Sequence, residues 1–251
     1  MSGFLQLIQK EIYRFCSIWV QTILGPLATA LLYQLIFGSQ LANVNTGINH
    51  IDYVTFLIPG LIMMQALLNS FGNSSSSIIQ AKYAGNIIYL LMAPISALAI
   101  YGAYLISSIV RGIIVAVTVF LGIIWFSAII HVSYLILIYF LIVGASITAG
   151  LGIIVGVLSE KFDQLAGFQS FIIVPLIYLS GIFLNPTHLS HIWQIITLFD
   201  PFFYIVDGFR YAFLQHSSNN IFIDSIFILI FSIIINIIGY YIIKSGVKLK
   251  K

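Results

Sequence analysis

The chain has 251 residues, of which 61% are hydrophobic, 15% are aromatic and only 7% are charged. An ordinary soluble domain carries about 25% charged residues, so this composition excludes a soluble enzyme or binding module and predicts a membrane protein. Cys16 is the single cysteine, which excludes an internal disulfide and a cysteine cluster that holds a metal.

The first segment, residues 1–16, has the pattern of an amphipathic helix. Between Phe4 and Trp19 apolar residues recur at helical spacing, while the polar residues fall largely on another face. A helix of this kind lies along a membrane surface with its apolar face in the headgroup region. We therefore predict an interface helix at the cytoplasmic surface.

Six windows are long and apolar enough to cross a bilayer, since a spanning helix needs roughly 20 apolar residues. They are Ser17–Phe37, Tyr53–Phe71, Ala97–Phe126, Ser133–Leu158, Leu165–Leu184 and Ile221–Ile243. The sequence thus predicts an all-α polytopic membrane protein with six transmembrane helices, forming one transmembrane domain over residues 1–251.

The basic residues predict how the chain is oriented. With six spans, both ends of the chain lie on one side of the membrane, and that side also collects Lys10, Arg14, Lys82, Lys161, Lys244, Lys248, Lys250 and Lys251. Arg210 falls in a segment on the other side. Because cytoplasmic segments carry an excess of Lys and Arg, we predict that both termini are cytoplasmic.

Segment 73–96, which follows the second span, and Arg111, which lies within the third, depart from the pattern of plain apolar spans. Segment 73–96 is too interrupted for a span and too apolar for a free linker, so we predict one or two short helices at the cytoplasmic interface. Arg111 lies inside the third window, where a charge costs roughly 2.5–3.5 kcal/mol on insertion scales. Structural pairing or snorkelling is one interpretation of Arg111, and a role in the transport path or in conformational switching is the other.

Glycines in the fourth window predict close helix packing. Gly152 and Gly156 are four residues apart, as are Gly144 and Thr148. The stretch "GLGIIVG" does not have the spacing of a dinucleotide-binding loop and lies in an apolar helix.

Two patterns near the outer segment 185–220 suggest chemistry but do not complete a site. His188 and His191 are three apart without a carboxylate or a third histidine nearby, so we interpret them as solvated residues rather than metal ligands. Ser180 in "YLSGIF" lacks both the preceding glycine and the histidine partner of an intramembrane protease. We therefore expect no catalytic residue and no metal site.

The stretch "FDPFFYIVDGFRYAFLQH" concentrates charge between two apolar segments. Asp200 before Pro201 is typical of a helix start, because the Asp side chain accepts from free N–H groups and Pro suits the first turn. Asp207 and Arg210, three apart, can pair along one face. We interpret this segment as a short outer re-entrant helix whose charges serve packing more than substrate contact. Its candidate gate residues are Asp200, Pro201, Tyr204, Asp207, Arg210 and Tyr211.

Five segments carry a resemblance to a known family. They are "FLIPGLIMMQAL" (Phe56–Leu67), "YLLMAPIS" (Tyr89–Ser96), "VRG" (Val110–Gly112), "KFDQLAGFQSFIIVPLIYLSGIFLNP" (Lys161–Pro186) and "DPFFYIVDGFRYAFL" (Asp200–Leu214). Over nearly its whole length the chain resembles the ABC-2 type permeases, the membrane subunits of bacterial ABC exporters, particularly those grouped with drug and polysaccharide exporters. That family has an N-terminal interface helix, six spans and a re-entrant helix pair before the last span.

The resemblance also implies partners. Two permease copies, here a homodimer, would pair with two cytoplasmic ABC ATPase subunits, and a coupling helix would map near Gln80–Leu91. Family members often have charged residues followed by Gly-Thr there, whereas this chain has Lys82, Tyr83, Ala84, Gly85 and Asn86. The chain has no phosphate-binding G-x-x-x-x-G-K-[ST] loop, so ATP and Mg are expected on the partner ATPase and no cofactor on this chain.

The function implied by the resemblance is that of a permease subunit, without its own catalysis, in the bacterial inner membrane. It would move an amphipathic, lipid-linked or glycan-type substrate, or a drug, outward by alternating access. The alternatives are a secondary transporter and a non-catalytic membrane assembly protein. A secondary transporter usually shows inverted repeats and several ionisable groups near mid-membrane. In this sequence Arg111 is the only clear mid-span charge, and no repeat is evident. We expect the lipid bilayer, and no nucleic acid, among the partners.

Overall fold

The computed structural model describes residues 2–40, 51–126, 132–183, 190–217 and 220–246, and these ranges contain helices and no strands. In chain order the helices are α1 (Ser2–Ser17), α2 (Gly25–Gln40), α3 (Tyr53–Tyr83), α4 (Asn86–Met92), α5 (Ala97–Ile123), α6 (Tyr134–Leu158), α7 (Phe162–Phe168), α8 (Val174–Leu179), α9 (His191–Leu198), α10 (Pro201–Leu214) and α11 (Ile221–Ser245). Two π-helical turns, Val20–Leu24 and Gln169–Ile173, join α1 to α2 and α7 to α8.

The prediction of an all-α protein with six spans is confirmed. Six helical segments are long and apolar enough to cross a membrane: Val20–Gln40, Tyr53–Tyr83, Ala97–Phe126, Tyr134–Leu158, Phe162–Leu179 and Ile221–Ser245. The end of the predicted fifth window, Leu184, lies outside the described residues. α9 and α10 meet at 89°, as expected for a re-entrant helix pair before the last span.

The second span is longer than its apolar window. α3 does not end at Phe71 but continues to Tyr83, so the first part of segment 73–96 belongs to this helix and α4 alone forms a separate short helix. The serine run can remain helical in the interior because its hydroxyl groups find acceptors: Ser75 donates to the Phe71 carbonyl at 2.7 Å and Ser74 to the Ala149 carbonyl at 2.9 Å.

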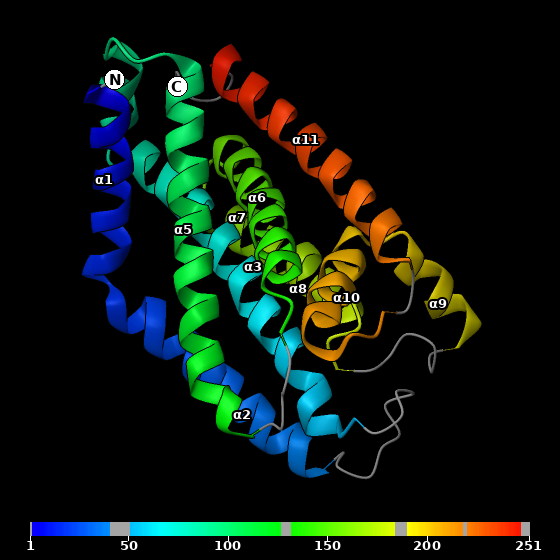
Figure 1. Cartoon of the computed structure of the whole chain (residues 1–251). Coiled ribbons are helices and arrows are strands. Elements are labelled where there is room, and N and C mark those ends of the chain that lie inside the picture. The colour runs from blue at the N-terminus through cyan, green and yellow to red at the C-terminus, as the bar shows by residue number, and fades with distance from the viewer. Residues whose placement is uncertain (1, 41–50, 127–131, 184–189, 218–219, 247–251) are drawn as a thin grey trace.

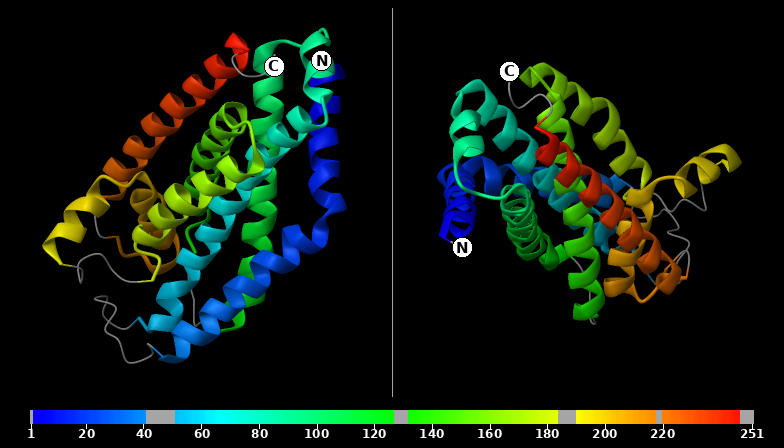
Figure 2. Two further views of the ribbon diagram at one scale, coloured as in Figure 1. Left: turned by 180° about the vertical axis from the view of Figure 1, so that it is seen from behind. Right: turned by 90° about the horizontal axis from the view of Figure 1, so that it is seen from above.

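α3 lies at the centre of the molecule, with α5 and α6 beside it (Figure 1). α3 and α6 are buried along most of their length, whereas α11 and the fifth span, α7 with α8, are mostly exposed. Figure 2 shows α11 along the outside of the molecule. The N-terminus, the end of α11 and α4 lie at one end, and α10 lies toward the other. α1 packs beside the first half of α5, and its placement along a membrane surface stays a prediction.

Close contact between α3 and α6 depends on glycine. A Cβ atom at Gly152 would lie 2.5 Å from the Phe71 carbonyl oxygen, and one at Gly156 would lie 3.0 Å from the Ser75 carbonyl oxygen. The predicted packing role of these glycines is thus confirmed, because a side chain at Gly152 would push the two backbones apart.

We predict that Gly152→Ala destabilises the protein by about 1–3 kcal/mol, because the new Cβ atom meets backbone that cannot move aside. The matched control is Gly167→Ala in α7, where a Cβ atom meets nothing within 4 Å. That variant should be neutral or stabilising, since Ala favours a helix over Gly. Thermal unfolding in detergent measures both, and equal midpoints for the two variants would contradict the packing argument.

Candidate functional site

α1 carries a carboxylate into the interior. Its buried row consists of Leu7, Glu11 and Phe15, spaced four residues apart, and Glu11 is fully buried. The carboxylate of Glu11 accepts from Lys10 at 3.0 Å, from Arg14 Nε at 3.0 Å and from Ser77 at 2.6 Å. Glu11 was not among the site residues predicted from the sequence. The available signal was its position on the same helical row as Leu7 and Phe15.

Two guanidinium groups from different helices meet at one asparagine. Arg14 of α1 donates to the side-chain oxygen of Asn73 at 2.8 Å and to its carbonyl at 2.9 Å. Arg111 of α5 donates to the same side-chain oxygen at 3.4 Å and to Asn69 at 3.1 Å. Asn73 itself donates to Ser108 at 3.0 Å. This network ties α1, α3 and α5 together.

The structure places Arg111 inside the helix bundle, with 7% of its surface exposed. Its amide partners on α3 agree with structural pairing and not with snorkelling to an interface. A role of Arg111 in the transport path stays a prediction.

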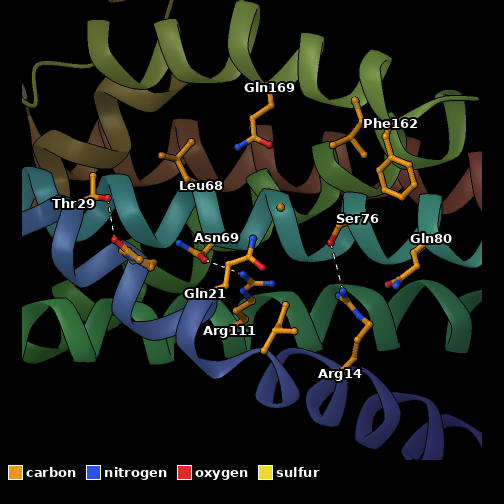
Figure 3. A pocket seen from close by; sticks show the side chains of 15 residues that line it. Arg14, Gln21, Thr29, Leu68, Asn69, Ser76, Gln80, Arg111, Phe162 and Gln169 are labelled. Carbon is orange, nitrogen blue, oxygen red and sulfur yellow. Dashed lines mark hydrogen bonds between the residues drawn. The ribbon is translucent and has the colours of Figure 1, made fainter.

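A cavity of about 550 Å³ lies beside the two arginines, between α1, α2, α3, α5 and the fifth span. The π-helical turn after α1 brings Gln21 to it, and Gln169 points toward it from the fifth span (Figure 3). Its polar lining consists of Arg14, Gln21, Thr29, Asn69, Ser76, Gln80, Arg111 and Gln169. Among the described residues that line it there is no Asp or Glu. The cavity is therefore polar, and both of its positive charges lie on one wall, where Arg14 and Arg111 meet at Asn73.

The four residues predicted to couple to an ATPase are divided between two environments. Tyr83, Gly85 and Asn86 are exposed at the end of the molecule where α1 begins and α11 ends. Gly85 has φ +70°, a conformation that favours glycine and lets the chain turn from α3 into α4. Lys82 instead reaches α6, where its ammonium group donates to the carbonyl oxygens of Val157 and Ser159. Lys82 thus holds the end of α6, and the coupling role of the segment stays a prediction.

α10 begins as predicted. Asp200 accepts from the Phe202 N–H at 2.9 Å, and Pro201 occupies the first turn. Tyr204 donates to the Leu198 carbonyl at 2.8 Å, which links α10 to α9. Tyr211 is half-buried.

Arg210 anchors α10 in the core through a backbone carbonyl and an aromatic ring, while the expected partner Asp207 acts on it electrostatically from beyond ion-pair distance. Its guanidinium, 3% exposed, donates to the Gly181 carbonyl at 2.8 Å and lies 3.9 Å from the centre of the Phe56 ring. Asp207 accepts from Ser217 at 2.9 Å. The ion pairs within 4 Å among the described residues do not include Asp207 with Arg210. Arg210 therefore ties α10 to the turn after α8 and to α3.

The other candidate chemistry does not assemble in the described part of the chain. No group of three or more His, Cys, Asp or Glu residues is placed there to hold a metal ion. His191 begins α9, and His188 lies outside the described residues. The hydroxyl of Ser180 donates to the Ile177 carbonyl at 2.6 Å.

Comparison with known proteins identifies the family. A family model described as ABC-2 type transporter matches residues 2–214. The chain belongs to the ABC-2 type transporter family. The inner membrane transport permease YadH of Escherichia coli (strain K12) is 35% identical to it over 205 residues, which cover 82% of this chain and 80% of that protein. The permease of the same name from Shigella flexneri matches with the same figures.

The match assigns a general role to this ABC-2 permease. It is a multi-pass membrane transport subunit of a family whose members normally pair with a cytoplasmic ABC ATPase. The matched region contains α1 to α10, and thus the arginine network, the cavity, α4 and the re-entrant pair. The resemblance inferred from the five segments is confirmed.

We predict that Glu11→Ala destabilises the permease by about 2 kcal/mol or more, because Arg14 and Ser77 lose a buried, charged acceptor. Lys10→Ala is the matched control, since Lys10 contacts the same carboxylate from a 58% exposed position. Its effect should stay below about 1 kcal/mol, as for other surface pairs. Denaturation in detergent measures the free energy of unfolding of both variants. An equal loss in the two would show that the contacts of Glu11 with Arg14 and Ser77 do not stabilise the fold.

A second prediction concerns α10. Arg210→Lys should destabilise the permease by about 1–3 kcal/mol although the charge is kept, because Lys lacks the planar group that stacks on Phe56. The unfolding midpoints of Asp207→Asn and of the Arg210→Lys/Asp207→Asn double variant are measured alongside it. Because Asp207 lies one helical turn from Arg210 and acts on it electrostatically, the midpoint shift of the double variant should differ from the sum of the two single shifts. A midpoint unchanged by Arg210→Lys contradicts the anchoring role.

Proposed function

We propose that the chain is the membrane-spanning subunit of an ATP-driven exporter in the bacterial inner membrane, with both termini in the cytoplasm. Its membership of the ABC-2 family, the six spans and the inner-membrane relatives support this proposal. The observation that carries the coupling step is the exposed apolar surface of α4. Tyr89 and Met92 are 74% and 77% exposed. They belong to α4, at the end of the molecule where α1 begins and α11 ends and where the basic residues predict cytoplasm.

The partner of this surface is the ABC ATPase. ATP and Mg would bind there, and this chain would contribute the path across the membrane. Two permease copies would form a homodimer with two ATPases, as the family resemblance implies. An amphipathic, lipid-linked or glycan-type substrate, or a drug, would be carried outward by alternating access.

The structure supports a route by which the ATPase could drive that change. α4 follows directly on the end of α3, and α3 is the buried central helix. Lys82 fixes the same end of α3 to α6, and Arg14 fixes the middle of α3 to α1. A push on α4 would therefore move α3 with both neighbours rather than bend a free loop, since packed interiors transmit displacement.

The alternatives differ in their need for an ATPase. A secondary transporter would work without one, and an assembly protein would move nothing. Transport in vesicles that requires both this chain and ATP favours the exporter.

We predict that a cysteine at Asn86 or Tyr89 crosslinks to the partner ATPase in a Cys16→Ser background, because Cys16 is exposed and is the chain's single cysteine. A cysteine at His216, exposed beside α10, is the matched control and should give no crosslink. The readout is the shifted band on a gel, with and without nucleotide. Absence of a crosslink from both α4 positions in both nucleotide states would overturn the coupling assignment.

A further inference from the structure

The charge around the cavity between α1, α3 and the fifth span is not balanced. Glu11 is the carboxylate of the arginine network, and its oxygens already accept from Lys10, Arg14 and Ser77. Arg111 makes no ion pair with the described residues, and its hydrogen-bond acceptors are neutral amides. A buried cation is stable when an anion or several acceptors compensate it. The cavity wall therefore favours a negatively charged occupant.

Arg111 also has an unused donor. Its Nε–H group is buried and has no hydrogen-bond partner. The residue as a whole is 7% exposed. A buried N–H without an acceptor costs roughly 1–3 kcal/mol. The guanidinium lies at the cavity wall between Asn69 and Gln21 (Figure 3). The Nε–H group has almost no accessible surface, so an occupant of the cavity would not reach it. Acceptor oxygens at this wall would instead compensate the charge of Arg111 through its terminal N–H groups.

Donors from other elements point to an occupant with oxygens on several sides. Gln21 lies on the turn after α1, Gln80 lies on α3, and Gln169 lies on the fifth span. Each of these side chains has an N–H group that can donate to an acceptor. A phosphate group has tetrahedrally arranged oxygens and is bound well by arginine. The arrangement suits phosphate better than a planar carboxylate, which presents oxygens on one side.

The rim of the cavity is apolar and open to the outside. Ile18 and Phe162 both line the cavity and are 42% and 45% exposed, one on the α1 side and one at the start of α7. Leu68, Pro26 and Leu165 continue this apolar lining inward. A hydrocarbon chain attached to the phosphate could leave between these side chains and enter lipid without exposing apolar surface to water.

We propose that this cavity binds the phosphate group of an anionic amphiphile, held by Arg111 and Arg14, with the first part of its hydrocarbon chain against Ile18 and Phe162. The bound molecule is either the transported cargo or a resident bilayer lipid. The cargo assignment rests on the proposed export function, whereas the binding site does not.

The test measures lipid binding to the full-length chain in detergent by native mass spectrometry. Dioleoyl phosphatidic acid is the probe, dioleoylglycerol has the same chains without phosphate, and inorganic phosphate has no chains. Phosphatidic acid should bind at least about tenfold more tightly than either, because a charge-assisted contact contributes more than a neutral one. Equal binding of dioleoylglycerol would overturn the phosphate assignment, and equal binding of inorganic phosphate would overturn the amphiphile.

Two variants remove the site in independent ways. Arg111→Gln removes the uncompensated charge, and its matched control is Lys244→Gln, which removes one charge at the end of α11 outside the cavity. Gly72→Leu fills the cavity without changing any charge, because a Cβ atom at Gly72 meets nothing within 4 Å. Its matched control is Gly167→Leu, which has equal room but does not line the cavity.

We expect about a tenfold loss of phosphatidic acid binding in Arg111→Gln and in Gly72→Leu, and less than a twofold change in each control. Because Gly72→Leu leaves the arginine network intact, its thermal midpoint reports folding independently of binding. Unchanged binding in a folded Gly72→Leu variant would overturn the proposal.

A second arm separates the two sources of the amphiphile. ATP hydrolysis by the permease–ATPase complex in nanodiscs is measured with and without phosphatidic acid. Stimulation that is lost in Gly72→Leu supports the site and assigns it to cargo, and binding without stimulation supports the site and assigns it to a resident lipid. If the complex forms no active ATPase while the lipid still binds, the export function fails and the binding site stands.

Discussion

Polar groups inside a bilayer must find their partners within the protein, because lipid offers no hydrogen bonds. The second span, α3, is where this constraint is strongest, since it carries asparagines and a run of serines through the centre of the bundle. The side-chain oxygen of Asn73 accepts hydrogen bonds from Arg14 and Arg111, and the hydroxyl of Ser77 donates to Glu11. The positions of α1 and α5 thus follow from the polar groups of α3, and the glycines of α6 let that helix approach from the other side.

The same constraint shapes the end of the molecule where α10 lies. A short helix that enters the membrane region needs partners for its charges, and α10 obtains them from the backbone after α8 and from an aromatic ring on α3. Backbone carbonyls are available there because the chain turns at Gly181, whose φ of +84° ends the helical ladder. The charges of α10 therefore serve to fix a helix that is too short to span. A movement of α3 would displace α10 as well, because the guanidinium of Arg210 on α10 packs on Phe56 of α3.

Some of this could be read from local sequence. The spans follow from hydropathy, since length and apolarity are properties of a segment alone, and the start of α10 follows from Asp200 and Pro201 because capping is local. Glu11 and the end of α3 could not be found in this way. A carboxylate on a surface-like helix and a serine run resemble solvated residues until a second helix covers them. The groups that Arg210 contacts directly, Gly181 and Phe56, are likewise distant in the chain. Spacing along the helix predicted only Asp207, which acts on Arg210 electrostatically without direct contact.

The sequence by itself determined that the chain is an all-α membrane protein, which parts of it span, and that it resembles an ABC-2 permease, because composition, periodicity and motifs are carried by contiguous residues. The tertiary structure alone decided which polar groups meet. It placed Arg14 and Arg111 at one asparagine and opened a cavity beside them, with Gln169 of a later span on the opposite wall. The physical reason is that a charge in a low-dielectric interior is compensated by whichever groups the packing of helices brings near, and not by its neighbours in sequence.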